Sequence, residues 1–261
     1  MTDVLIPLAT VSPVVWLACW LLALLGLNLN YFLITLSSYA YFWRLPTNAI
    51  RIQERDIRPG QIRREISWSM LSMVVYATLT VATIFAFRKG WFPNLYVAPL
   101  ERGWLTLIGG FLFILVVQDV LFYVTHRLLH TRLLARFHRV HHASKLPTPF
   151  ALYSFHPVEA LLHFVRIPLI LIVCPTNLFV FIFCEVVISN GLNAYSHLNY
   201  EPRWVRNIRW LHERCAAASS YHGLHHEKSQ GNYGGYLRLW DRLAGTMLPE
   251  SKSSDRKVYG S

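Results

Sequence analysis

The feature that most constrains this chain is its set of long uncharged apolar runs. No charged side chain occurs from Val4 to Trp43, and a second uncharged run extends from Ile66 to Phe87. Each run is long enough for a helix of about 20 residues to cross the hydrocarbon core of a bilayer. A third apolar stretch extends from about Gly103 to Tyr123. These runs predict an all-α, integral-membrane protein.

The basic residues are concentrated between the apolar runs. The formal net charge is +11, although only 15% of the residues are charged. Anionic headgroups and the enrichment of Lys and Arg in cytoplasmic loops explain such an excess in a membrane protein. Nucleic acid is therefore not an expected partner. The loop from Arg44 to Arg64 contains six arginines and is predicted to be cytoplasmic.

The first apolar run is predicted to be a retained span. It has no basic segment before it and no small-residue cleavage site, so it does not have the pattern of a signal peptide. The four cysteines include no Cys-x-x-Cys pair. Neither a disulfide framework nor a thiolate zinc site is indicated.

The stretch from Ala160 to Gly191 allows two topologies. Pro175 divides it into two apolar segments that are each slightly short for a full crossing. One broken span would place the residues after it on the opposite side of the membrane from those before it. A hairpin that turns at "CPTN" would return the chain to the same side. We expect the hairpin, because it brings together the histidine clusters described next.

The expected architecture is a bundle of about four to five spans with a cytosolic helical cap. Three regions are predicted along the chain. Residues 1–102 hold the N-terminal spans and the Arg-rich loop, residues 103–250 hold the catalytic domain, and residues 251–261 form a flexible tail.

Three clusters of histidine carry the chemistry: "HRLLH", "HRVHH" and "HGLHH". Residues three or four apart share one face of a helix, so we expect each cluster to point at one centre. Imidazole binds iron, zinc, copper or nickel, and the histidines exceed the four ligands of one tetrahedral ion, which predicts two metals. The alternative is a set of surface histidines on a basic helix at the membrane. The predicted ligands are His126, His130, His138, His141, His142, His222, His225 and His226.

Other polar residues near the apolar runs are candidates to complete the site. His197 follows the last run, with Asn193 one turn earlier, and is either a further ligand or a hydrogen-bonded core histidine. A ligating histidine usually donates its other ring N–H to a carboxylate or carbonyl. Asp119 and Glu185 are the acids expected in this supporting role, since ionisable groups inside a membrane are functional candidates. For Asp119 the alternative is an interfacial acid, and Tyr123 is either an interfacial aromatic or a supporting partner.

Three histidines are given no metal role. His156 is expected to cap or bond locally beside Pro157, His163 to pair with Glu159 four residues earlier, and His212 to lie on the surface. The Glu-x-x-His pairs of soluble di-iron bundles are absent from the sequence. Spacing alone therefore predicts an imidazole-rich dimetal site at a membrane face.

The three clusters resemble the histidine boxes of the fatty acid hydroxylase and sterol desaturase superfamily, which are integral-membrane di-iron oxygenases. The resemblance extends from about Asp119 to Pro249. The segments "PTPFALYSFHPVE" and "NYGGYLRLWDRLAGTM" are most similar to sterol C5-desaturases, with sphingoid-base hydroxylases next. The chain departs from the C5-desaturase pattern at Tyr153, where histidine is more usual, and in "CAAASSY" before the third box.

The resemblance implies a function and a set of cofactors. Two iron ions, with zinc possible in their place, would be held by the three boxes and His197, with Asn193 near the site. With O2 as co-substrate, these ions would desaturate or hydroxylate a membrane lipid, and the expected substrate is a sterol or a sterol-like molecule. An external electron donor of the cytochrome b5 or ferredoxin type, with its reductase, is implied. The positive charges of the Arg-rich loop and of the histidine-rich stretch place the boxes on the cytoplasmic face, of the endoplasmic reticulum membrane in a eukaryote or of the inner membrane in a bacterium.

Two alternatives remain open at this stage. Within the same chemistry, the substrate is a sphingoid base, a fatty acyl chain or a carotenoid that becomes hydroxylated. In a different class, the chain is a membrane protein that handles metal or haem without lipid chemistry. Transport would place ligands inside spans and on both faces, whereas these clusters lie beyond the span ends on one inferred face.

Overall fold

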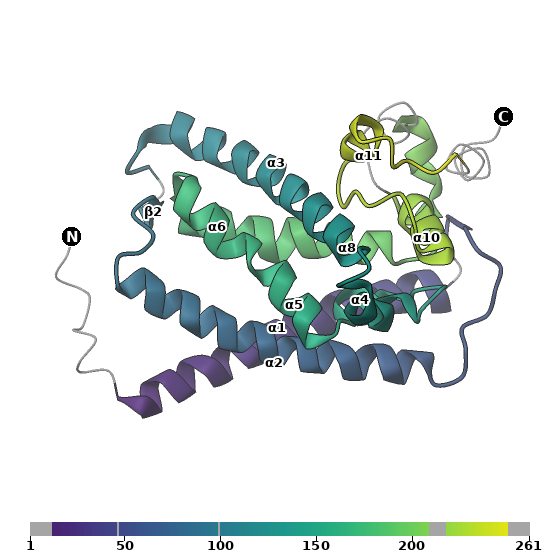
Figure 1. Ribbon diagram of the computed structural model, residues 1–261, viewed down its shortest axis with the longest axis horizontal. Helices are drawn as coiled ribbons and strands as arrows, with labels where there is room; N and C mark the ends of the chain where they lie inside the picture. The colour runs from purple at the N-terminus through teal and green to yellow at the C-terminus, as the bar shows by residue number, and fades with distance from the viewer. Residues whose placement is uncertain (1–11, 46, 99, 209–217, 250–261) are drawn as a thin grey trace.

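The computed structural model describes residues 12–45, 47–98, 100–208 and 218–249 (Figure 1). Its described part is built from helices, with only short two- and three-residue strands. Four helical segments are long and apolar enough to cross a membrane: Pro13–Arg44, Gln61–Arg88, Gly103–Leu129 and Leu178–Ser196. The predicted all-α membrane bundle is confirmed.

The first two spans pack against each other along one side of the molecule (Figure 1). Helix α1 (Pro13–Tyr39) begins after Ser12, whose side chain accepts a hydrogen bond from the main-chain N–H of Val15. It continues into the π-helical turn η2 (Ala40–Arg44), and α2 (Gln61–Arg88) follows the Arg-rich loop. Leucines on α1 are strongly exposed, Leu33 by 72%. Such an apolar outer face is suited to contact with lipid.

The N-terminal spans share a hydrophobic core with the middle of the chain. The 3-10 turn η3 (Pro149–Tyr153) and helix α5 (Pro157–Phe164) pack on α1 and α2. The main-chain carbonyl of Phe150 accepts hydrogen bonds from the Tyr31 hydroxyl at 2.9 Å and from Ser69 at 3.1 Å. These bonds fix the segment after the second histidine cluster to the spans.

Helix α3 (Gly103–Leu129) extends further than the apolar stretch that predicts it. No glycine or proline interrupts the chain after Tyr123, so the helix continues through His126 and ends with His130 as its C-terminal cap. A short turn leads to α4 (Ala135–His142). The first two histidine clusters therefore lie on consecutive helices.

The chain reverses direction at Pro175, as the hairpin model predicts (Figure 1). Thr176 and Asn177 form the short strand β3, which pairs in parallel with β2 (Leu95–Tyr96). A Cβ on Gly110 of α3 would lie 2.8 Å from the Pro175 carbonyl oxygen, so the turn packs closely on α3 because Gly110 has no side chain. The arms of the hairpin are α5 and α6 (Arg166–Val173) on one side, and α7 (Leu178–Phe183), η4 (Cys184–Ser189) and α8 (Asn190–Ser196) on the other.

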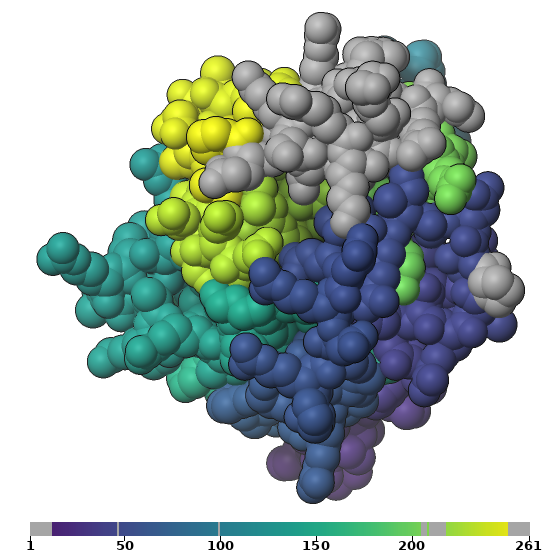
Figure 2. Space-filling view, turned by 90° about the vertical axis from the view of Figure 1, so that its right-hand side faces the viewer, coloured from purple at the N-terminus to yellow at the C-terminus, as the bar shows by residue number. Residues whose placement is uncertain are grey.

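The remaining segments form a cap at the end where the hairpin returns. Strand β4 (Tyr200–Pro202) pairs antiparallel with β1 (Ala49–Arg51), which ties the Arg-rich loop to the chain after α8. Figure 2 views this end, where residues of the Arg-rich loop, α4 and the C-terminal segment meet on one face. The cap also contains η5 (Arg203–Ile208), α10 (Ser219–Lys228) and α11 (Leu239–Leu243). His212 and the tail 251–261 lie outside the described residues.

Candidate metal centre

Nine histidines gather in two groups at the junction of the bundle and the cap. Within each group the candidate ligand nitrogens all lie within 4.8 Å of one another. His197, at the end of α8, joins the boxes as the sequence predicts. Group one is His126, His130, His138, His142 and His225, and group two is His141, His197, His222 and His226.

The second and third boxes are each divided between the groups, so the expectation that each box points at one centre is wrong. His138 and His142 belong to group one, whereas His141 belongs to group two. In the third box, His225 is separated from its neighbour His226 in the same way. Adjacent residues on an α-helix are rotated by about 100°, because a turn contains 3.6 residues. The helices that carry the second and third boxes therefore lie between the two groups, and each supplies imidazoles to both.

The main chain sets the tautomer of several imidazoles. A carbonyl only accepts hydrogen bonds, so the Nδ1 facing it carries the proton and the Nε2 lone pair is free to bind a cation. Four histidines have this contact, at 2.6 to 3.0 Å. They are His126 with Tyr233, His197 with Asn193, His225 with Gly231 and His226 with Ser144.

The inward-facing nitrogens have the spacing of metal ligands. In group one, the Nε2 atom of His142 lies 3.0 Å from those of His138 and His225. In group two, the Nε2 atom of His222 lies 3.2 Å from that of His197 and 3.1 Å from that of His226. Two nitrogens bound to one ion at about 2.0–2.1 Å are roughly 2.9–3.4 Å apart for angles of 90–110°.

Converging lone pairs repel one another unless a cation lies between them. The buried Nε2 of His126 has no hydrogen-bond partner among the described residues, although its Nδ1 is bonded to Tyr233. Buried polar atoms of this kind are rare unless water or an ion satisfies them. The residues present therefore fit a pair of bound metal ions.

Burial keeps these imidazoles neutral, which a metal ligand requires. Desolvation lowers the pKa of His197 to about 4. Burial, aided by neighbouring positive charge, lowers the pKa of His130 to about 4 and that of His142 to about 3. Near neutral pH, proton competition for the three nitrogens is therefore weak.

Glu159 is the supporting carboxylate that the sequence interpretation missed. Its Oε1 lies 2.6 Å from Nδ1 of His138, and both side chains are buried. The predicted pairing with His163 is present but longer, at 3.9 Å. Glu159 lies in the first turn of α5, which the Nδ1 of His156 caps by accepting from the N–H of Val158, as predicted for His156. Only the packing of α5 on α4 brings this acid to a candidate ligand.

Asp119 and Glu185 were expected to accept hydrogen bonds from the histidines, and the structure corrects this expectation because both have other partners. The Asp119 oxygens accept from the main-chain N–H of Tyr236 at 2.7 Å and from the Trp240 indole at 2.6 Å. Glu185 forms an ion pair with Arg166 at 2.7 Å and also accepts from Gln118. Asp119 thus anchors the C-terminal segment and Glu185 holds the hairpin, and within the described part of the chain neither bonds directly to a histidine.

The other two supporting residues differ in how they contact the site. Asn193 contacts His197 through its main-chain carbonyl, while its side chain donates to the carbonyl of Leu152 at 3.2 Å. The Tyr123 hydroxyl lies 3.1 Å from Thr246. Tyr123 therefore ties α3 to the C-terminal segment.

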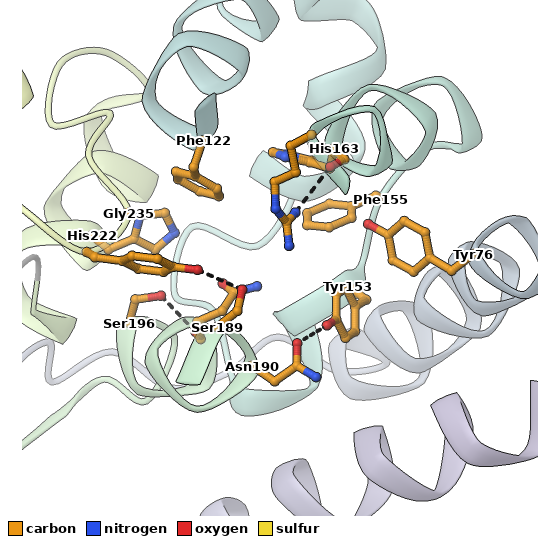
Figure 3. Close-up of a pocket in the computed structure, with 13 residues that line it drawn as sticks. Tyr76, Phe122, Tyr153, Phe155, His163, Ser189, Asn190, Ser196, His222 and Gly235 are labelled. Carbon is orange, nitrogen blue, oxygen red and sulfur yellow. Dashed lines mark hydrogen bonds between the residues drawn. The ribbon is translucent and has the colours of Figure 1, made fainter. Parts of the chain in front are cut away.

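A cavity lies beside group two, with His222 in its wall (Figure 3). Phe122, Phe155 and His163 line it as well, and Figure 3 shows their rings facing the space in front of His222. The cavity is enclosed by the hairpin, α2, α3 and the glycine-rich segment after α10. Its other lining residues are Tyr76, Tyr153, Arg166, Ser189, Asn190, Asn193, Ser196, Gly235 and Tyr236.

Several known proteins are similar to this chain in sequence. The chain is 28% identical to lathosterol oxidase of Rattus norvegicus over 225 residues, which covers 85% of this chain and 72% of the relative. It is 27% identical to a Delta(7)-sterol 5(6)-desaturase of Gibberella zeae, with coverage of 93% and 65%. A very-long-chain aldehyde decarbonylase of Oryza sativa subsp. japonica is 28% identical, with coverage of 95% and 39%.

No solved structure matches this chain. The model of the family described as fatty acid hydroxylase matches residues 111–246, which is more than half of the 261 residues. The matched region contains all nine grouped histidines, which are the eight of the three boxes and His197. With its four apolar helices and two groups of buried imidazoles, this chain belongs to the fatty acid hydroxylase family.

Proposed function

We propose that this protein is a membrane-bound oxygenase that oxidises a lipid, with a sterol or sterol-like molecule as substrate. The observation that carries the proposal is the cavity with His222 in its wall, inside a bundle whose outer surface is apolar. The names of its relatives, lathosterol oxidase and sterol 5(6)-desaturase, support a sterol substrate. The region 103–250 would carry this chemistry.

The nine histidines would hold two iron ions, five nitrogens around one and four around the other. When bound, the iron pair would supply the reductive activation of O2 that oxidises an unactivated C–H bond. The chain itself contributes the fixed tautomers, because backbone carbonyls and Glu159 orient the rings. The apolar rings of Phe122 and Phe155 exclude water from the space in front of His222.

Metal analysis and lipid analysis together test this function. Purified active protein should contain two metal ions per chain, with iron rather than zinc supporting turnover. Mass spectrometry of lipids from cells with and without the protein should show a sterol that has lost two hydrogens. An unchanged lipidome, with O2, an electron donor and sterol supplied, would contradict the proposal and favour a metal- or haem-handling role.

The electron donor and the membrane side are further parts of the proposal. We infer an external donor of the cytochrome b5 or ferredoxin type, and we place the histidines on the cytoplasmic side because the Arg-rich loop at the same end is expected there. The membrane is that of the endoplasmic reticulum in a eukaryote or the inner membrane in a bacterium. Reporter fusions after Leu146 and after Ser261 should both give cytoplasmic signals, and opposite signals would contradict this placement.

A second candidate is hydroxylation of a sphingoid base or acyl chain. Tyr153, in the cavity wall, occupies a position where a sterol C5-desaturase more usually has histidine. In the same lipid analysis, this candidate predicts the gain of one oxygen on a long-chain base or acyl chain and no change in sterols.

A further inference from the structure

The cavity beside group two has a polar side that the metal chemistry does not use. Figure 3 shows Tyr76 and Tyr153 on one side of the cavity, and His222 and Gly235 on the other. Tyr76 comes from the middle of α2, a predicted span, and its side chain points toward the cavity. Polar groups in the middle of a membrane helix are functional candidates, because hydrocarbon offers them no partner.

The hydroxyl of Tyr76 has no hydrogen-bond partner among the described residues, although the residue is only 8% exposed. Its tyrosine neighbours differ in this respect. Tyr153 donates to Asn190, and Tyr236 donates to Ser189 at 2.7 Å. Buried hydroxyls are nearly always paired. The Tyr76 hydroxyl is therefore available to bond a ligand in the cavity.

Arg166 adds donors to the same wall. The described contacts of its guanidinium are the ion pair with Glu185 at 2.7 Å and a bond to the carbonyl of His163 at 3.1 Å. A guanidinium has five N–H donors, so these two contacts leave others facing the cavity that Arg166 lines. An oxygen that accepts hydrogen bonds would satisfy both Arg166 and Tyr76.

The charge balance decides what kind of oxygen fits. The positive charge of Arg166 is already compensated by Glu185, so the pair is neutral as a whole. A second anion would add an uncompensated charge in surroundings shielded from water, which is strongly unfavourable. A neutral hydroxyl or carbonyl oxygen carries no such penalty. The wall therefore favours a neutral oxygen over a carboxylate, phosphate or sulfate.

We propose that Tyr76 and Arg166 bind the neutral hydroxyl or keto oxygen of the lipid substrate, while its hydrocarbon frame extends toward His222. This inference rests on the proposed function, since it assumes that a lipid enters the cavity to be oxidised beside group two. It assigns Tyr76 as a residue that determines substrate specificity. It also excludes plain hydrocarbons and anionic lipids as preferred ligands.

Ligand binding without turnover tests the assignment. The full chain is purified in detergent and labelled with a hydroxylated sterol that carries a photoreactive diazirine. The competitors are cholestanol, cholestanone, cholestane and cholestanol sulfate, with octadecanol and octadecane as a second pair. Since one hydrogen bond contributes about 0.5–1.5 kcal/mol, the alcohol or ketone should compete about two- to twelvefold better than its hydrocarbon. The sulfate should compete less well than the alcohol.

The variant Tyr76→Phe keeps the ring and removes one of the two proposed donors, so it should reduce the advantage of the alcohol over the hydrocarbon, while Arg166 keeps part of it. Tyr96→Phe is the matched control, because Tyr96 is also buried with an unpartnered hydroxyl but lies on β2, outside the cavity lining. It should keep the discrimination. If neither alcohol exceeds its hydrocarbon in the unaltered protein, if Tyr76→Phe keeps the full preference, or if the sulfate binds best, the inference is overturned.

Binding and turnover separate this inference from the proposed function. If binding of the alcohol over the hydrocarbon depends on Tyr76 but the iron-loaded protein oxidises no lipid, the pocket assignment is supported and the proposed oxygenase function is contradicted. Lipid oxidation without discrimination between alcohol and hydrocarbon would support the oxygenase and contradict the pocket assignment.

Discussion

The two histidine groups are built from the same helices but face different surroundings. Group one includes His130, which is partly exposed, and it receives a carboxylate through Glu159 and His138. All four histidines of group two are buried, and its His222 lines the cavity. Backbone carbonyls orient His197 and His226 in group two.

This difference suggests a division of tasks between the groups. Group one reaches the protein surface through His130, the member of the nine that is not buried. Group two lies beside the cavity, which its His222 lines. Under the proposed function, a site that combines electrons from an external donor with an apolar substrate needs access from both the surface and the cavity. The following experiments test whether the groups differ in this way.

Loss of a ligand should have the largest effect. We expect His142→Ala in group one and His226→Ala in group two each to reduce lipid oxidation by more than about a hundredfold, which is the upper range seen for groups that only support a ligand. Each variant should lose metal from its own group first. Metal analysis with circular dichroism measures both content and folding, and a variant that keeps two ions and full turnover would contradict the assignment.

Removal of the Glu159 carboxylate should affect group one alone. Because Glu159 accepts from His138, we expect Glu159→Gln to weaken metal binding in that group by about ten- to a hundredfold. Competition with a chelator should therefore release one ion earlier than the other. Glu185→Gln is the control, because Glu185 pairs with Arg166. Equal loss in both variants would mean that general destabilisation, rather than support of His138, causes the effect.

The return of the hairpin beside α3 brings the two groups together, and a glycine pair tests it. Gly110→Ala places a Cβ 2.8 Å from the Pro175 carbonyl oxygen and should destabilise the protein by about 1–3 kcal/mol. Gly109→Ala is the matched control, since a Cβ there meets no atom within 4 Å and alanine favours a helix by about 1 kcal/mol. Thermal unfolding in detergent should separate the two. Equal melting temperatures would contradict the close turn.

The smallest effect should come from narrowing the cavity next to group two. A Cβ on Gly235 would lie 2.6 Å from the ring of Phe122, which must then shift toward the cavity. We expect Gly235→Ala to raise the KM for the lipid by about two- to tenfold, which corresponds to less than about 1.4 kcal/mol, while metal content stays the same. Gly191→Ala, where the added Cβ meets no atom within 4 Å, should leave KM unchanged. A loss of metal in Gly235→Ala would indicate that the substitution disturbs the ligands.

Local sequence patterns predicted the spans, because crossing a bilayer requires a long apolar helix whatever its neighbours are. They also predicted the histidines that gather, since spacing along one helix is a local property. The apolar stretch alone ends near Tyr123, whereas α3 continues to Leu129, because apolarity marks the membrane-spanning part of a helix and not its end.

What the sequence by itself determined is the set of apolar helices and the supply of imidazole ligands, since both depend on residue type and on spacing within a helix. Tertiary structure alone decided which nitrogens face which group, because that depends on how α4 and α10 are rotated between the two. It also decided that Glu159, and neither Asp119 nor Glu185, contacts a candidate ligand, His138. A hydrogen bond requires two groups within about 3 Å, and packing between helices distant in sequence fixes such distances.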